Sequence, residues 1–267
     1  MSERLKGSGG FRGDTYLTIK RIMIPSYDLN KIKFATDEAT FGRAVGLYEG
    51  GKVAEVEELG GYYSAVVLGT KPYRVSMSVQ RYGYGDCTCY LGQKDTLCKH
   101  MVALALHVVM KGRPLSGDDK QQCHQTVCSD KREALNEEEL MAVKKTITEA
   151  MRYIKRYTGP SRTWFANQDS LREGCNMLST IVSGLPVNKQ TAEILVKLLL
   201  RLDKKLCEGV DDSNGIVGGF ISEAVQILEE FVRIDPDCIK AFGSLIGRKT
   251  CFGWEGPLVR ILDETQT

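Results

Sequence analysis

Hydrophobic and polar residues alternate most regularly in the segment 73–80. Its apolar members are Tyr73, Val75, Met77 and Val79. Because successive side chains of a strand point to opposite faces, this pattern predicts a strand with one buried face. Segments 62–68 and 52–58 also favour strands, the latter with a weaker pattern. Turn residues at 69–72 separate the strands at 62–68 and 73–80, so we expect these two strands to form a hairpin of a small antiparallel sheet.

Further elements are expected on both sides of this sheet. Residues 16–24 are rich in β-branched and aromatic side chains, which predicts another strand. Residues 37–48 carry apolar side chains at helical spacing, Thr36 or Asp37 can supply the N-cap, and Gly50-Gly51 ends the pattern, so a helix is predicted here. Residues 99–110 are apolar on nearly every side, and we expect them to form a helix buried against the sheet.

Helical spacing continues from about residue 130 to the end of the chain. Asn136 can cap a helix that we expect to reach residue 157, before Gly159-Pro160 ends it. Five further helices are predicted, near residues 169–183, 189–208, 219–234, 236–246 and 255–265. The whole pattern predicts an α+β fold, in which a small antiparallel sheet with a buried helix precedes an all-α, irregular helical domain.

The composition suits a folded globular chain of one large or two ordinary domains. The 267 residues are 42% hydrophobic and 26% charged. We expect a flexible, Gly-rich N-terminus, an α+β domain, a linker and a helical domain, with bounds at 1–13, 14–112, 113–130 and 131–267. The formal net charge is only +2, so any basic surface must be local.

The sequence also suggests a compartment. The N-terminus lacks the apolar core of a signal peptide, and the longest apolar run, 101–110, is too short to span a bilayer. Nine cysteines without an export signal favour a reducing compartment, which is the cytoplasm or, in a eukaryote, the nucleus.

Three thiols and one imidazole stand out as candidate metal ligands. They form the pattern C-x-C-x8-C-x-H at Cys87, Cys89, Cys98 and His100. In an extended segment residues i and i+2 point to one side, so Cys87 and Cys89 can face the same ion. Cys98 and His100 would diverge in a regular helix, so we expect them where a loop enters the helix predicted at 99–110.

Zinc is the interpretation that these paired doublets favour. One alternative is a structural cysteine cluster or a disulfide, although a disulfide needs an oxidising compartment. Another is a nucleophilic pair of Cys98 with His100, for which no orienting group is visible in the sequence. Four protein ligands leave no position for water on a tetrahedral ion, so we expect one structural rather than catalytic Zn²⁺. No paired-carboxylate or nucleophile constellation is recognisable in the sequence, so we expect no enzymatic activity.

The pattern resembles the SWIM zinc-finger family, whose signature is C-x-C, a variable gap, and C-x-H leading into a helix. The helix and strands that precede it also resemble microbial SWIM proteins, so the resemblance covers about residues 37–112. It implies an accessory module that binds DNA or protein partners, as in helicase-like chromatin remodellers, Mutator-type transposases, recombinase-partner proteins and ubiquitin-linked kinases. No ATPase or transposase domain is recognisable in this sequence.

A basic stripe in the helical half is a candidate nucleic-acid surface. Lys145, Arg152 and Arg156 would share one face of the helix expected at 136–157, and Arg162 follows with two aromatic residues. Basic side chains meet phosphates and aromatic rings stack on bases, although an ordinary solvated face would show the same residues. A second basic patch near the metal motif is formed by Arg81, Lys94, Lys99, Lys111 and Arg113.

The sequence favours two functions over a third alternative, an uncharacterised enzyme. The first is a nucleic-acid-associated adaptor, for DNA more than RNA. The second is a protein–protein scaffold in which the helical domain binds the partner and zinc only holds the fold. No membrane contact or small-molecule substrate is expected. Cys123, His124 and Cys128 are close enough together to bind a second metal, but a fourth ligand is not evident.

Overall fold

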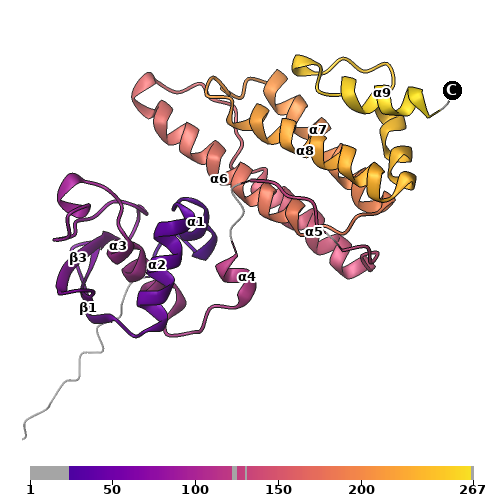
Figure 1. The fold of residues 1–267 in the computed structure, drawn as a ribbon. Helices are drawn as coiled ribbons and strands as arrows, with labels where there is room; N and C mark the ends of the chain where they lie inside the picture. Colours follow the sequence, from indigo (N-terminus) through magenta and orange to yellow (C-terminus); the bar gives the residue numbers. More distant parts are fainter. Residues whose placement is uncertain (1–23, 122–124, 130, 266–267) are drawn as a thin grey trace, which may run out of the picture.

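The computed structural model describes residues 24–121, 125–129 and 131–265. Within these ranges a three-stranded antiparallel sheet with helices is followed by a mainly helical region, as the α+β prediction has it (Figure 1). The expected flexible N-terminus, and residues 16–23 of the strand expected at 16–24, lie outside the described ranges.

The sheet has the strand order β1-β2-β3 and confirms the alternation in the sequence. Its strands are β1 (Val53–Leu59), β2 (Tyr62–Leu68) and β3 (Pro72–Ser78). Tyr63 pairs with Met77 across the β2–β3 hairpin, and both side chains are fully buried. One face of the hairpin therefore belongs to the core.

Two helices precede the sheet in the part of the chain that the structure describes. The predicted helix is present as α2 (Glu38–Glu49), and the Asp37 carboxylate caps it by accepting a hydrogen bond from the Thr40 backbone N–H. The sequence pattern did not reveal α1 (Leu29–Phe34), a helix of six residues with Asp28 as its N-cap.

The helix expected at 99–110 is observed as α3 (Lys99–Met110), and it packs against α2 and β3. Leu104 and Leu106 on this helix are fully buried, together with Phe41 of α2. A short 3-10 helix, η1 (Gly92–Lys94), precedes α3, and α4 (Gly117–Lys120) falls inside the range expected to be a linker.

The second half is helical, as predicted. Its elements are α5 (Glu137–Ala150), η2 (Ser161–Thr163), α6 (Trp164–Ser183), α7 (Lys189–Cys207), α8 (Ile216–Ile234), η3 (Pro236–Leu245), η4 (Cys251–Gly253) and α9 (Gly256–Glu264). They enclose a second hydrophobic cluster that includes Leu178, Leu195 and Leu228. The segment near 236–246 is a 3-10 helix, and α6 begins five residues before the predicted start.

The helix expected at 136–157 is shorter than predicted. After Ala150 the backbone tightens into turns, in which the Arg152 and Tyr153 N–H groups donate to the carbonyls of Glu149 and Ala150, three residues back. Further along, the Tyr157 N–H donates to the Gly209 carbonyl. The prediction that Arg152 and Arg156 share a helical stripe with Lys145 is therefore wrong, since only Lys145 lies on α5.

The two hydrophobic clusters meet between α1 and α6. Lys31 of α1 forms an ion pair with Glu173 of α6, whose side chain is only 4% exposed. Phe34 of α1 packs into the second cluster, and its carbonyl accepts a hydrogen bond from the Asn176 amide. This short helix thus connects the region around the sheet to the helical region.

The described part of the chain contains no helix long and apolar enough to cross a membrane. None of the cysteines in the described ranges forms a disulfide.

Candidate metal centre

Cys87 pairs in an extended conformation with β3, and Cys89 follows at a bend after this pairing. The Ser76 N–H donates to the Asp86 carbonyl at 2.8 Å, and the Thr88 N–H donates to the Arg74 carbonyl at 3.1 Å. Val75 and Cys87 form an antiparallel bridge between these two bonds. The backbone pairing holds the first ligand doublet against the sheet.

Cys98 and His100 lie where the loop enters α3, which confirms the second spacing argument. Cys98 is the N-cap residue with extended backbone angles, and its carbonyl accepts the first helical hydrogen bond, from the Val102 N–H at 3.1 Å. His100 follows in the first turn. The change from extended to helical backbone lets residues i and i+2 turn their side chains toward one point.

The four ligand atoms form one buried cluster. They all lie within 4.8 Å of one another, and each of the four residues is at most 7% exposed. The His100 Nδ1 atom is 3.7 Å from the Cys87 sulphur and 3.9 Å from the Cys98 sulphur. Zinc bonds of about 2.3 Å to sulphur and about 2.0 Å to nitrogen would place these atoms about 3.5 Å apart around a tetrahedral ion.

The protonation of the thiols is coupled inside the cluster. A hydrogen bond between the thiols raises the pKa of Cys87 and lowers the pKa of Cys98, while burial raises the pKa of both. Metal ligation requires deprotonated thiols, and a divalent cation among them would compensate their buried negative charge. The chemistry of the donor set and its geometry both fit such an ion.

Glycines let the loop approach the cluster closely. A Cβ atom on Gly92 would lie 2.3 Å from the Cys87 carbonyl oxygen, and one on Gly85 would lie 2.1 Å from the Ser76 carbonyl oxygen. The Gly92 N–H donates a hydrogen bond to the Cys89 sulphur at 3.3 Å. Ligand spacing alone does not predict this role, although a glycine inside the eight-residue gap is a visible signal.

The imidazole of His100 is held from both sides. The Tyr73 ring stacks on it with centroids 4.3 Å apart and an angle of 25° between the planes. The Nε2 atom is buried without a hydrogen-bond partner among the described residues, and it faces Gly69, where a Cβ atom would lie 3.2 Å away. These contacts turn Nδ1 toward the thiols.

The predicted nucleic-acid residues are all exposed and lie on different elements. Lys145 is on α5, Arg152 and Arg156 are in the turns after it, and Arg162 is in η2. A Cβ atom on Gly209 would lie 3.3 Å from the Arg156 Nε atom, so this guanidinium lies against the end of α7. Arg162 lines a cleft together with Tyr84.

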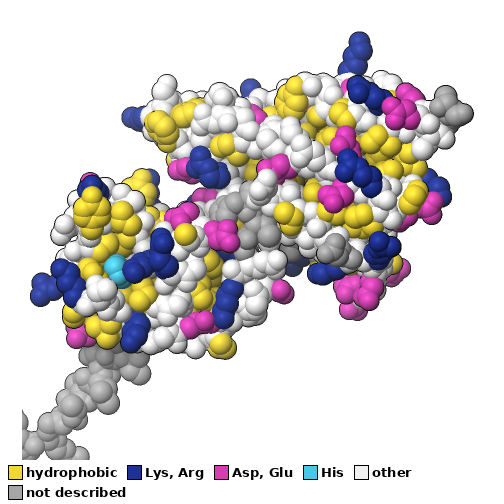
Figure 2. Space-filling model, viewed as in Figure 1, with side chains coloured by type: hydrophobic (Ala, Val, Ile, Leu, Met, Phe, Trp, Pro, Cys, Tyr) yellow, Lys and Arg dark blue, Asp and Glu magenta, His cyan; other side chains and the backbone are white. Residues whose placement is uncertain are grey.

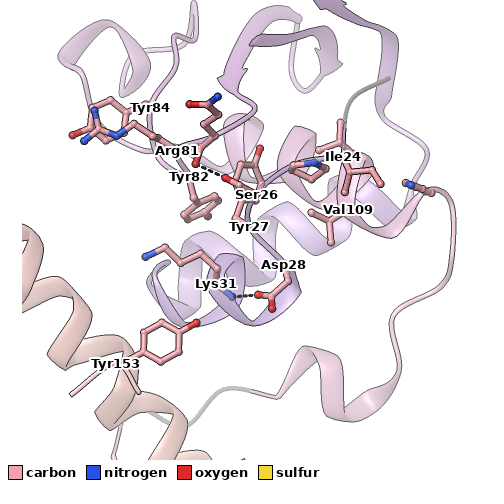
Figure 3. A pocket seen from close by; sticks show the side chains of 14 residues that line it. Ile24, Ser26, Tyr27, Asp28, Lys31, Arg81, Tyr82, Tyr84, Val109 and Tyr153 are labelled. Atoms are coloured by element: carbon pink, nitrogen blue, oxygen red, sulfur yellow. Dashed lines mark hydrogen bonds between the residues drawn. The ribbon is translucent and has the colours of Figure 1, made fainter. Parts of the chain in front are cut away.

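Part of the second basic patch surrounds a hollow at the C-terminal end of α3, the end of this helix away from Cys98 and His100. Figure 3 shows Arg81, Tyr82 and Tyr84 of the loop after β3 on one side of this hollow of about 680 Å³. Lys31 of α1 and Lys111 at the end of α3 also line it. The sequence placed Arg81 and Lys111 in one patch, but the structure adds Lys31 and the tyrosines.

Other expectations lie outside the described ranges. Cys123 and His124, two of the three residues considered for a second metal, are among the residues that the structure leaves undescribed.

Comparisons with known proteins give no match: no family model, no curated protein and no solved structure matches this chain. The likeness to SWIM zinc fingers therefore rests on the four-residue pattern and on the buried cluster that these residues form.

Proposed function

We propose that this protein binds one structural Zn²⁺ ion through Cys87, Cys89, Cys98 and His100. The observation that carries the proposal is the mutual approach of these four ligand atoms inside the core. Thiolate-rich, tetrahedral donor sets suit zinc, and four protein ligands leave no open position for a catalytic water. When bound, the ion contributes a crosslink between the loop after β3 and the start of α3.

We further propose that the protein is a nucleic-acid-associated adaptor. The hollow at the end of α3 supports this function, since Arg81 and Lys111 supply cations and Tyr84 supplies an aromatic ring that is 55% exposed. Phosphates bind cations, and unstacked bases stack on aromatic rings. The resemblance to SWIM fingers favours DNA over RNA.

The loop that carries Arg81 and Tyr84 connects β3 directly to Cys87. The Arg81 guanidinium lies over the Tyr84 ring, 4.3 Å from its centroid, and the Ser78 N–H donates to the Tyr84 carbonyl at 2.7 Å. A bound ion would fix the end of this loop, so zinc would hold the cation and the ring in a single arrangement. This is the mechanism by which a structural ion would serve recognition.

The basic surface is local. Figure 2 shows basic and acidic side chains interspersed over the face that it presents, rather than one continuous basic area. We therefore expect modest affinity that depends on a few residues around the hollow, and a correspondingly small salt dependence.

Fluorescence anisotropy tests the proposal. The zinc-loaded full chain is titrated into labelled single-stranded and double-stranded DNA and RNA, at low and at physiological salt. Binding that weakens with salt is expected, and Arg81→Ala should reduce the slope of log affinity against log salt by about 1. The matched control is Arg260→Ala on α9, an exposed arginine away from the hollow that should leave binding unchanged. Absence of binding at low salt would refute the adaptor function.

A protein–protein scaffold is the second candidate. It is favoured by large apolar side chains on the surface of the helical half, where Met141, Phe165 and Phe252 are 64%, 73% and 65% exposed. A stoichiometric partner that dissociates from Phe165→Ser, together with no nucleic-acid binding, would select this function.

A further inference from the structure

Two cysteines outside the metal motif come together at the end of α7. The sulphur of Cys207, the last residue of α7, lies 3.0 Å from the sulphur of Cys251, the first residue of η4. The two residues are 44 positions apart in the chain, so the tertiary fold alone brings them together. Cys207 is exposed and Cys251 is half-buried.

Asp203 fixes this arrangement. Its Oδ1 atom accepts hydrogen bonds from the Cys251 backbone N–H at 2.7 Å and from the Trp254 indole N–H at 3.1 Å. Asp203 also lies one turn before Cys207 on α7, so the carboxylate and the thiol project from the same face. The aspartate thus attaches η4 to α7 in the position that sets Cys251 against Cys207.

The geometry distinguishes a disulfide from a second metal site. Asp203, Cys207 and Cys251 could together hold an ion. Two thiolates at about 2.3 Å from a tetrahedral zinc would have sulphur atoms about 3.8 Å apart, well beyond the observed 3.0 Å. The Asp203 Oδ1 atom is also already engaged by two N–H donors. The approach of the sulphur atoms therefore favours a bond between them.

We propose that Cys207 and Cys251 are an oxidisable thiol pair, which forms a reversible disulfide on reaction with a low-molecular-weight disulfide. The exposed Cys207 is the sulphur that such a reagent can reach. The hydrogen bond to Cys207, with burial as a second cause, raises the pKa of Cys251, which keeps this second thiol protonated until the first step has occurred.

The reaction balances with the external disulfide as the oxidant. The Cys207 thiolate attacks one sulphur of the reagent, forms a mixed disulfide and releases one thiolate, which takes the proton of Cys251. The Cys251 sulphur then attacks Cys207, forms the protein disulfide and releases the second thiolate, which takes up the proton that Cys207 lost. Two protein thiols are oxidised while one external disulfide is reduced to two thiols.

The product would link the end of α7 to the segment that leads into α9, and it would close a loop containing α8 and η3. It would leave the metal motif untouched, since those four residues are buried elsewhere in the fold.

The test treats the zinc-loaded full chain with oxidised glutathione, blocks remaining thiols with an alkylating reagent and maps peptides without reduction. A peptide pair linked through Cys207 and Cys251 is expected, reversible by dithiothreitol, at unchanged zinc content. The matched control Cys238→Ser, at a fully buried cysteine of η3, should still form the link. In Cys251→Ser, Cys207 should stop at the glutathione mixed disulfide.

Three results would overturn the proposal. The first is a wild-type protein in which both thiols are still free after the glutathione treatment and are therefore alkylated. The second is a wild-type protein that stops at a mixed disulfide on Cys207. The third is a second zinc equivalent that is lost in Cys207→Ser, which would make the cluster a metal site instead.

Discussion

Substitution of Gly92 by alanine tests the metal centre through its packing while leaving all four ligands in place. Gly92 is the first residue of η1, and its backbone angles are open to any residue, so the effect of a methyl group there is steric. The added Cβ atom would lie 2.3 Å from the Cys87 carbonyl oxygen and 2.5 Å from the Cys87 Cβ atom. Either Gly92 or the ligand residue must move.

The required movement exceeds what the ligand geometry tolerates. Raising the 2.3 Å contact to the 3.0 Å minimum for real Cβ atoms needs a displacement of 0.7 Å. Metal–ligand distances tolerate only about 0.2 Å. Overpacking of this kind costs about 1–3 kcal/mol. A midpoint of about 2 kcal/mol corresponds to zinc affinity weaker by about 30-fold.

A chelator competition titration measures this loss, with the melting temperature recorded on the same samples. The control is Gly42→Ala in α2, where an added Cβ atom meets nothing within 4 Å. This change should leave zinc affinity unaltered and stabilise the helix by about 0.5–1 kcal/mol. Zinc affinity of Gly92→Ala within about threefold of wild type, a difference of less than 1 kcal/mol, would refute the reasoning.

Three further predictions concern other parts of the fold. Tyr73→Ala removes the ring stacked on His100, and we expect zinc affinity to fall by about 10–100-fold in the same chelator titration, because supporting contacts orient metal ligands. Unchanged affinity would show that the ring does not orient the imidazole. Burial raises the pKa of Glu173 above its ordinary 4.5 despite the ion pair with Lys31, so the ionised carboxylate opposes folding and its cost grows as the pH rises through that range. The melting temperature of Glu173→Gln relative to wild type should therefore increase from pH 4.5 upward in a series of thermal scans, and a decrease would contradict this sign. Oxidation of Cys207 and Cys251 closes a loop across 44 positions, and the chain-entropy relation predicts that this crosslink raises the free energy of unfolding by up to about 4 kcal/mol. Denaturant midpoints that coincide for the oxidised and reduced protein would argue against a constraining crosslink.

The elements that the sequence predicts well depend on short-range patterns. The alternation at 73–80 requires only a strand period, and it locates β3 within two residues at either end. The C-x-H doublet before an apolar run placed Cys98 at the entrance of α3, because the capping geometry is local. The candidate metal site could therefore be assembled from spacing alone.

The elements that it predicts poorly depend on distant partners. The segment after α5 leaves the predicted helical path, and its Tyr157 N–H donates to the Gly209 carbonyl, a partner far along the chain. The stacking of Tyr73 on His100 depends on how the strand meets α3. Cys207 and Cys251 show no paired spacing in the sequence, so only the fold reveals their contact.

The zinc content of the purified full chain tests the central claim most directly. Elemental analysis with native mass spectrometry should find one zinc per chain, lost in Cys98→Ser and retained in Cys238→Ser, whose cysteine is equally buried but outside the cluster. A wild-type chain without zinc, after expression and purification in zinc-containing buffer, would contradict the account.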